Sequence, residues 1–318
     1  MRYMKAFRKG NSQREFHQSF RSQSAMEYLM TYGWAILIIA VVLAALFELG
    51  VFNPMTFAPK APPGSCQVMR PEGAGTTDFI SLEGECNGEL PQYAAYFNGN
   101  AYVNVPSSSS LNPVTTGITI SYWVEPSSIS SEQINTCMWR AIVGPNPFSG
   151  GYLSWLDGCN NEVSGLVYVS GTRYNAPSYD SLNYNQWYHV VEVAQTGSYL
   201  ILYVNGQAVG SPGTPLPSGN IGTNNNMVNI GGNQGGNAAG GWFYGYLSNV
   251  QIYNTSLSPS EIQALYQEGI GGAPIDLQNL IAWWPLNGNA KDYSGNDNNG
   301  VPNGVTYTSN WYSGYSAP

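Results

Sequence analysis

The fold class is decided by the stretch Trp187-Tyr188-His189-Val190-Val191-Glu192-Val193-Ala194, continued by Gln195-Thr196-Gly197-Ser198 and by Tyr199-Leu200-Ile201-Leu202-Tyr203-Val204-Asn205-Gly206. Its two long runs are rich in β-branched and aromatic residues, which favour strands. Four residues that include a glycine join the runs, and this length is typical of a hairpin with a longer loop. Asn205-Gly206 then begins a second tight turn. The stretch therefore predicts a β-hairpin that continues into another strand.

The chain on both sides of this hairpin shows the same character from about Gln92 onward. Short apolar alternations are separated by Asn-Gly, Ser-Gly and Pro-Ser turns, a pattern typical of an all-β sandwich or barrel. One helix is expected at 258–268, where Ser258 is the N-cap, Pro259 the first helical residue and Glu261 the partner in a capping box. Its apolar stripe is formed by Ile262, Leu265 and Tyr266, and Gly269 ends it.

Four pieces of this region, taken in order, resemble the concanavalin A-like, laminin-G-like jelly-roll sandwiches over about 92–310. They are 95–99 (Ala-Tyr-Phe-Asn-Gly) with 102–106, then 118–124 (Ile-Thr-Ile-Ser-Tyr-Trp-Val), then the Trp187 hairpin, and finally 243–253 running into the Ser258 helix. The resemblance implies an all-β jelly-roll domain over 92–318 with a lectin-like, glycan-binding role.

The C-terminal segment departs from the usual order of that family. Residues 280–286 (Leu-Ile-Ala-Trp-Trp-Pro-Leu), with 292–300, resemble the segment that normally opens such a domain. A lone pair of strands would be marginal in water and would leave an open edge. We therefore expect a circularly permuted jelly roll that 280–308 completes. A truncated second copy is the alternative.

A different motif lies near the N-terminus, where Arg21-Ser22-Gln23-Ser24-Ala25-Met26-Glu27-Tyr28 runs into an apolar segment. An acid at the mouth of a membrane-length helix is costly without a partner. The stretch resembles the class III signal peptide of archaeal type IV pilin precursors, over about 14–50. The resemblance implies that a leader peptidase removes 1–22 between Ser22 and Gln23. It also implies that Glu27 neutralises the new N-terminus as helices 23–50 assemble into a homo-oligomeric filament.

Two other readings of the N-terminus stay open. The 20 residues from Tyr28 to Phe47 would form about 30 Å of helix, enough for a static membrane anchor. A conventional secretory signal fits less well, because its cleavage site would follow the apolar run and no A-x-A pattern occurs there. Six of the eleven basic residues precede Gln23, which indicates a cytoplasmic leader and an extracellular remainder. We expect a precursor in the cell membrane that becomes part of an extracellular surface filament.

Residues 51–91 are expected to form a spacer and a stapled loop. Proline and small residues dominate 51–65, which is typical of a stiff linker, and 66–90 show little periodicity. Four cysteines on the exported side suggest two disulfides, for which three pairings are formally open. The sequential pairing closes two short loops of similar length, Cys66–Cys86 and Cys137–Cys159. Zinc binding is disfavoured because no C-x-x-C spacing occurs.

Charge and motif content exclude several functions. Beyond Ser22 five basic residues face eighteen acids, and nucleic acid requires a positive surface. Catalysis is not expected, because no strand carries alternating acids for glycoside hydrolysis. The pair Glu83 and Glu85 lies in the cysteine loop, and His189 is the one histidine beyond the leader. The glycine tract 231–236 opens no helix, which argues against phosphate binding.

Three weaker site candidates remain. Asp292, Asn296, Asp297 and Asn298 crowd one loop and offer oxygen ligands for calcium, although Asx side chains that cap their own turn explain the same pattern. Trp139, Trp155 and Tyr179 are candidates for a sugar platform, against a place in the core. Asn254-Thr255-Ser256 is a glycosylation sequon.

Together these observations predict a pilin-like filament subunit that presents a lectin-like adhesion domain to a glycan. The first alternative is a static membrane-anchored glycan-binding protein, and the second is a divergent glycan hydrolase.

Overall fold

The computed structural model describes residues 30, 32–44, 66–71, 77–83, 90–128, 139–145, 150–158, 160–222, 227–232 and 240–318, with the backbone alone at 66–71, 77–83 and 240. The chain divides into two compact units, 1–60 and 61–318.

The first unit contains a helix at 32–44. Its large apolar side chains are exposed, for example Trp34 at 66% and Ile39 at 58%. Among the described residues, no helix combines the length and the apolar character needed to cross a membrane. The rest of the predicted helix 23–50 lies outside the described residues, as do the leader, Ser22, Gln23 and Glu27.

The second unit begins with a small sheet of β1 (Cys66–Pro71), β2 (Thr77–Glu83) and β3 (Leu90–Pro91), paired in that order. Residues 66–71 and 77–83 are therefore strands within the segment where a stapled loop was expected. Stretches such as Gln67-Val68-Met69 and Phe79-Ile80-Ser81 pair across an antiparallel ladder, and their periodicity is too short to stand out in the sequence. The side chain of Cys66 and the residues Cys86, Cys137 and Cys159 lie outside the described part, so the disulfide pairing stays a prediction.

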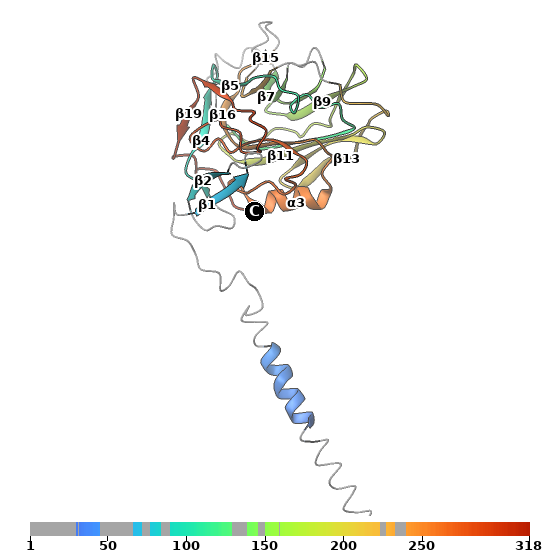
Figure 1. The fold of residues 1–318 in the computed structure, drawn as a ribbon, viewed down its shortest axis with the longest axis vertical. Helices are drawn as coiled ribbons and strands as arrows, with labels where there is room; N and C mark the ends of the chain where they lie inside the picture. Colours follow the sequence, from blue (N-terminus) through green and yellow to red (C-terminus); the bar gives the residue numbers. More distant parts are fainter. Residues whose placement is uncertain are drawn as a thin grey trace, which may run out of the picture. The chain divides into compact units, whose positions relative to one another are not determined.

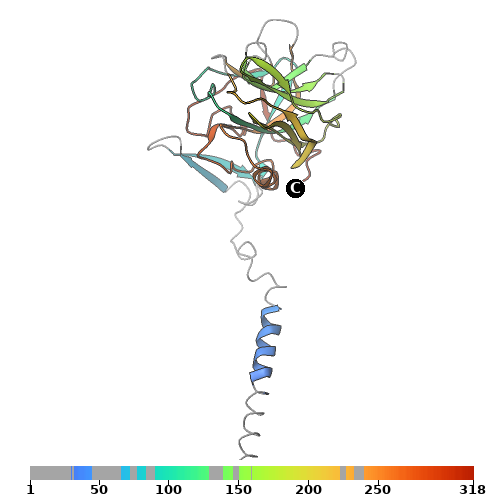
Figure 2. The same ribbon diagram turned by 90° about the vertical axis from the view of Figure 1, so that its right-hand side faces the viewer.

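Two larger sheets form the sandwich that dominates this unit (Figure 1). One, which we call the front sheet, has the order β10 (Thr172–Asn175), β9 (Val163–Val169), β8 (Tyr152–Asp157), β7 (Trp139–Pro145), β14 (Val228–Ile230), β5 (Tyr102–Val105) and β18 (Val301–Asn303), with β15 (Gly240–Gly241) pairing with β7. The other, the back sheet, has the order β13 (Gln207–Pro215), β12 (Tyr199–Val204), β11 (Tyr188–Gln195), β6 (Gly117–Pro126), β16 (Tyr244–Tyr253), β4 (Ala94–Asn98) and β19 (Thr306–Thr308), with β17 (Leu280–Trp284) pairing with β16. The two sheets stack as layers (Figure 2).

The predicted hairpin forms the middle of the back sheet. β11 and β12 pair from Val190 with Val204 to Gln195 with Tyr199. At the next turn Asn205 and Gly206 both have left-handed backbones, with φ of 49° and 73°, as a two-residue hairpin turn of the primed type requires. The prediction of an all-β sandwich from this stretch is confirmed.

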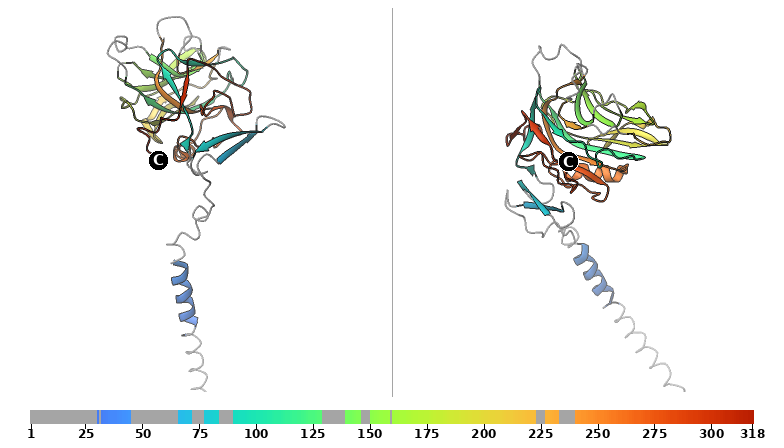
Figure 3. Two further views of the ribbon diagram at one scale, coloured as in Figure 1. Left: turned by 90° about the vertical axis from the view of Figure 1, so that its left-hand side faces the viewer. Right: turned by 45° about the horizontal axis from the view of Figure 1, so that its top comes forward.

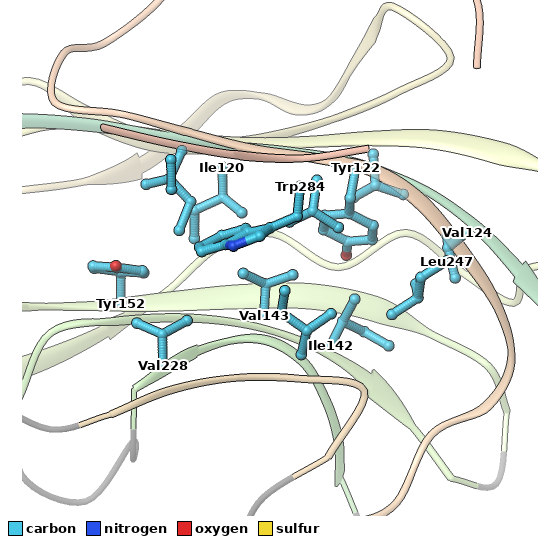
Figure 4. Packing of buried hydrophobic residues seen from close by; sticks show 14 of the residues in the cluster. Ile120, Tyr122, Val124, Ile142, Val143, Tyr152, Val228, Leu247 and Trp284 are labelled. Atoms are coloured by element: carbon cyan, nitrogen blue, oxygen red, sulfur yellow. The ribbon is translucent and has the colours of Figure 1, made fainter. Parts of the chain in front are cut away.

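The core lies between the two sheets, and Trp284 of β17 is fully buried in it. Figure 4 shows its indole between Ile120, Tyr122 and Val124 of the back sheet and Ile142 and Val143 of the front sheet. Alternate residues of each strand supply this layer, as the two-residue period of a strand dictates.

The C-terminal segment belongs to the same sandwich. β17 pairs with β16 and β19 with β4 in the back sheet, while β18 pairs with β5 in the front sheet. In Figure 3 the red C-terminal strands lie beside the cyan strands of the domain's start. Residues 280–308 thus complete both sheets, as expected, and a truncated second copy does not fit this pairing.

The outer face of the back sheet is covered by the predicted helix, α3 (Pro259–Glu268) (Figure 1). Ser258 and Glu261 make the capping box, and Gly269 ends the helix at φ 78°. Ile262 and Leu265 pack on outward residues of β11, β12, β16 and β17 in one cluster. Among the described residues of this unit, no helix covers the outer face of the front sheet.

Candidate functional site: an aromatic and polar surface on the front sheet

The outward residues of β7, β8 and β9 form an aromatic cluster. Because side chains alternate along a strand, Tyr152 and Leu156 of β8 enter the core while Leu153 and Trp155 face outward. The outward residues Ala141, Leu153, Trp155 and Leu166 pack together, with Trp139 and Tyr168 against them.

Trp139 and Trp155 stack within this cluster. Their ring centroids are 5.0 Å apart and their planes differ by 23°. The Arg173 guanidinium carbon lies 4.6 Å from the centre of the Trp139 ring, a cation–π arrangement. Trp155 is 8% exposed, whereas Trp139, Tyr168 and Arg173 are partly exposed. The stack therefore offers an aromatic surface with a fixed cation at its side.

A polar hollow begins beside this stack. It has a volume of about 330 Å³ and is lined by Asn160, Glu162, Asp180 and Ser181. Trp139 pairs in register with Asp157, and the Asp157 N–H donates to the Glu162 carbonyl at 2.7 Å. One strand, β8, therefore separates Trp139 from the hollow. Its size lies at the lower end of the range for small-molecule sites.

Further aromatic and amide groups face outward on the other half of the front sheet. The rings of Tyr102 on β5 and Trp242, which follows β15, lie 5.2 Å apart. Asn104 and Asn229 are direct neighbours on β5 and β14. The side-chain oxygen of each is buried without a hydrogen-bond partner, which is costly unless a ligand or water donates to it.

The front surface extends over four neighbouring strands, from Trp155 on β8 to Tyr102 on β5, or ~14 Å. Trp242 lies within this span, because β15 pairs with β7 at Trp139 and Arg140. Aromatic rings can stack on the apolar faces of sugar rings, while amides and carboxylates take up hydroxyl groups. The front surface, by which we mean Trp139, Trp155, Tyr168, Arg173, the polar hollow, Asn104, Asn229, Tyr102 and Trp242, therefore has the chemistry and the length to hold several linked sugars.

The calcium candidate has a different role in the fold. Asp292 is buried, and its Oδ1 accepts from the N–H groups of Trp283 and Ser294, each at 2.9 Å. Its Oδ2 accepts from the Asn298 N–H and the Ser294 hydroxyl, also at 2.9 Å. Burial raises the pKa of this carboxyl, and the four hydrogen bonds oppose the rise.

The other members of that loop are also engaged or face solvent. Asn298 Oδ1 accepts from Ser108 Oγ at 2.5 Å, Asn296 Nδ2 donates to the Leu280 carbonyl at 3.2 Å, and Asp297 is exposed with φ 57°. No group of three or more His, Cys, Asp or Glu side chains gathers as a metal site among the described residues. The hydrogen bonds of Asp292, Asn296 and Asn298 agree with the capped turn. Calcium here stays an untested expectation.

The remaining sequence candidates lie at separate places in the fold. Tyr179 packs against the main core instead of joining Trp139 and Trp155, so the prediction of a sugar platform was wrong for Tyr179. His189 is buried and accepts from or donates to Ser121 Oγ at 2.9 Å, and burial lowers its pKa to about 3, as suits a neutral core residue. Asn254 is exposed, as a sequon requires. Glu85 and 233–236 of the glycine tract lie outside the described residues.

Sequence reasoning missed most of the front surface. Tyr168 and Arg173 belong to no recognisable motif in the sequence. Asn104, Asn229 and Trp242 come from three distant segments. The usable signal was the alternation along 152–157 and 163–169, which places Trp155 and Tyr168 on one face.

Comparisons with known proteins agree with the fold. The family model of the concanavalin A-like lectin/glucanases superfamily matches residues 97–263. No curated protein sequence matches the chain. A crystal structure of a candidate carbohydrate binding protein from Bacteroides ovatus is similar with a TM-score of 0.53 and 18% identity, over 74% of this chain and 64% of that one. The chain thus spans less than two thirds of that protein's length.

A native heptameric SAP-like pentraxin from Limulus polyphemus aligns with a TM-score of 0.47 and 16% identity, over 68% of this chain and 94% of that chain. At such identities the likeness to the Bacteroides protein shows the sandwich fold and nothing finer. Folds of this kind host many functions, so the sandwich alone does not assign one.

Proposed function

Because this chain belongs to the concanavalin A-like lectin/glucanases superfamily, we propose that it binds a carbohydrate chain on its front surface, without catalysis. The observation that carries the proposal is the Trp139–Trp155 stack beside the polar hollow. The name of the similar Bacteroides ovatus structure, a candidate carbohydrate binding protein, points the same way.

The chemistry of the front surface supports a neutral or basic glycan. The hollow places Glu162 and Asp180 together, and their carboxylates would accept hydrogen bonds from sugar hydroxyls. Arg173 beside Trp139 adds one donor group. The buried Asn104 and Asn229 oxygens would regain partners when sugar hydroxyls reach them.

Binding to polysaccharide-coated gels by affinity electrophoresis tests this proposal. Trp139→Ala should lose most of the retardation, since it removes one ring of the stack on which a sugar would lie, and aromatic contacts contribute about 0.5–1.5 kcal/mol each. Trp242→Ala should weaken the binding of long chains more than that of short ones. Tyr312→Ala, an exposed aromatic residue that stacks on Trp311 away from β7 and β8, is the matched control. Equal retardation of Trp139→Ala and Tyr312→Ala would show that the site lies elsewhere.

A glycan hydrolase is the second candidate, because two carboxylates line the same hollow and paired acids perform that reaction. Incubation with the bound polysaccharide distinguishes the two. Binding alone predicts no new reducing ends. Release of sugars that is lost in Glu162→Gln would replace the binding proposal with hydrolysis.

We further propose that the N-terminal unit presents this domain at the cell surface as a pilin-like filament subunit. The support is the sequence motif around Gln23 and Glu27 together with the exposed apolar side chains of helix 32–44. An apolar helix face of this extent requires lipid or other helices as cover, and identical helices in head-to-tail contact build a helical fibre. The alternative is that the N-terminal unit is a static membrane anchor that holds the domain at the cell surface.

A further inference from the structure

A second group of aromatic and acidic side chains lies on the outer face of the back sheet, away from the front surface. Glu125 of β6 pairs in register with Tyr246 of β16, and Tyr246 pairs with Tyr96 of β4. Tyr244, two residues before Tyr246, lies on the same face because strand side chains alternate. We call Glu125, Tyr246, Tyr96 and Tyr244 the tyrosine–glutamate row.

The three tyrosine rings are set at angles to one another. The Tyr96 centroid lies 4.9 Å from that of Tyr246 with the planes at 48°, and 5.9 Å from that of Tyr244 with the planes at 76°. The Tyr96 and Tyr244 hydroxyls are hydrogen-bonded to each other, and burial is the main cause that raises the pKa of Tyr96. All three tyrosines remain partly exposed. Ring faces in several orientations concentrate negative electrostatic potential on a small volume.

Glu125 is 4% exposed, yet its carboxylate makes no hydrogen bond or ion pair in the part of the chain that the structure describes. The cations whose side chains are described are used elsewhere. Arg140 donates to the Gly158 carbonyl, Arg173 lies over Trp139, and Lys291 lies over Tyr293. Most of the Glu125 side chain is enclosed and no cation lies beside its carboxylate among the described residues, so a bound cation would supply the missing counter-charge.

From this geometry we propose that the tyrosine–glutamate row binds a primary ammonium group, such as a lysine side chain or an amino sugar carries. The ammonium N–H groups would donate to the Glu125 carboxylate and to tyrosine hydroxyl oxygens, while the ring faces attract its charge. The assignment is independent of the front surface, because it uses the other sheet.

A proton and the ammonium group compete for the Glu125 carboxylate, so binding at this site should depend on pH. Burial raises the pKa of Glu125 to about 7, and the titratable groups that face it are Tyr246 and, beyond it, Tyr96 and Tyr244. Below pH 7 the Glu125 carboxyl is mostly neutral and does not attract the charge of the ammonium group. Ammonium affinity should therefore rise as the pH increases from 6 to 8, by up to about tenfold for each pH unit below the pKa.

Calorimetric titration of the full-length protein in detergent tests the proposal, with Nα-acetyl-lysine amide, glucosamine and tetramethylammonium as probes. The first two should bind, and the tighter of them identifies the source of the ammonium. Tetramethylammonium, which has no N–H, should bind more weakly. Glu125→Gln should lose roughly tenfold in affinity together with the pH dependence, because a charge-assisted hydrogen bond and an ion pair are removed. Tyr96→Phe keeps the ring and should retain most of the affinity.

Glu268→Gln removes an exposed acid from α3 and is the matched control. Equal affinity of Glu125→Gln and Glu268→Gln for the lysine probe would refute the assignment. So would an absence of binding to the folded wild-type protein, or equal affinity for tetramethylammonium. A near-ultraviolet circular dichroism spectrum identical to that of the wild type verifies that Glu125→Gln is folded.

Discussion

Glu192 gives the sharpest test of the core. It lies on β11 between Val190 and Ala194, which both enter the core, and it is fully buried with neither carboxylate oxygen paired. A Cβ at Gly165 on the facing β9 would overlap this carboxylate, so the glycine makes room for it. Burial raises the pKa of Glu192 well above its usual 4.5.

The expected effect has a definite sign and slope. The folded protein holds the Glu192 proton more tightly than the unfolded chain, so stability is lost as the pH rises above 4.5 towards the folded pKa. The loss is about 1.4 kcal/mol for each pH unit over which the folded carboxyl stays protonated while the unfolded one ionises. Gln has nearly the same shape and does not titrate. Glu192→Gln should therefore become more stable than the wild type by about that amount per pH unit above pH 5.

Urea unfolding of the full-length protein at pH 5, 6, 7 and 8 measures this difference. Glu125 and Asp292, whose pKa values are also raised by burial, are present in both proteins and cancel in the comparison. Glu268→Gln, which changes an exposed acid on α3, should follow the wild-type profile. If the profiles of Glu192→Gln and the wild type run parallel from pH 5 to 8, Glu192 is not the unpaired core acid described above.

Three other predictions concern the chain ends and the cysteines. Truncation after Gly272 removes β17–β19 and the Trp284 indole, whose burial alone contributes about 4–6 kcal/mol, so the domain should unfold or aggregate; a monomer with an unchanged melting temperature would contradict this. N-terminal sequencing of surface-exposed protein should read from Gln23, and Glu27→Ala should block filament assembly but not membrane insertion, whereas a retained leader would favour the static anchor. Non-reducing peptide maps should contain Cys66–Cys86 and Cys137–Cys159, and free thiols or crossed pairs would show the pairing wrong.

The parts of the fold that sequence could predict are those specified by neighbours along the chain. The hairpin of β11 and β12 and the capped helix α3 depend on turn residues, caps and periodicity within about twenty residues, and both formed as expected. The role of 280–308 was also predictable, because two adjacent tryptophans in an apolar run have to be buried.

The front surface could not be predicted because it depends on register between distant strands. Asn104 and Asn229 become neighbours only through the pairing of β5 with β14, and Trp242 reaches Tyr102 across the sheet. Tyr179 shows the opposite error. It was expected on the surface with Trp139 and Trp155, but it packs against the main core. The loop at 292–298 has the composition of a cation site, yet its carboxylate holds backbone N–H groups.

The pairing of the domain's first strands with its last has a consequence for the order of synthesis. Tyr96 of β4 is opposite Thr306, and Val103 of β5 is opposite Pro302, so β4 and β5 each keep one edge unpaired until 301–308 has been synthesised. Contacts of such long sequence separation form slowly, and an unpaired edge in the meantime invites aggregation. Both large sheets therefore gain their last edge strands, β18 and β19, only after 301–308 has been synthesised.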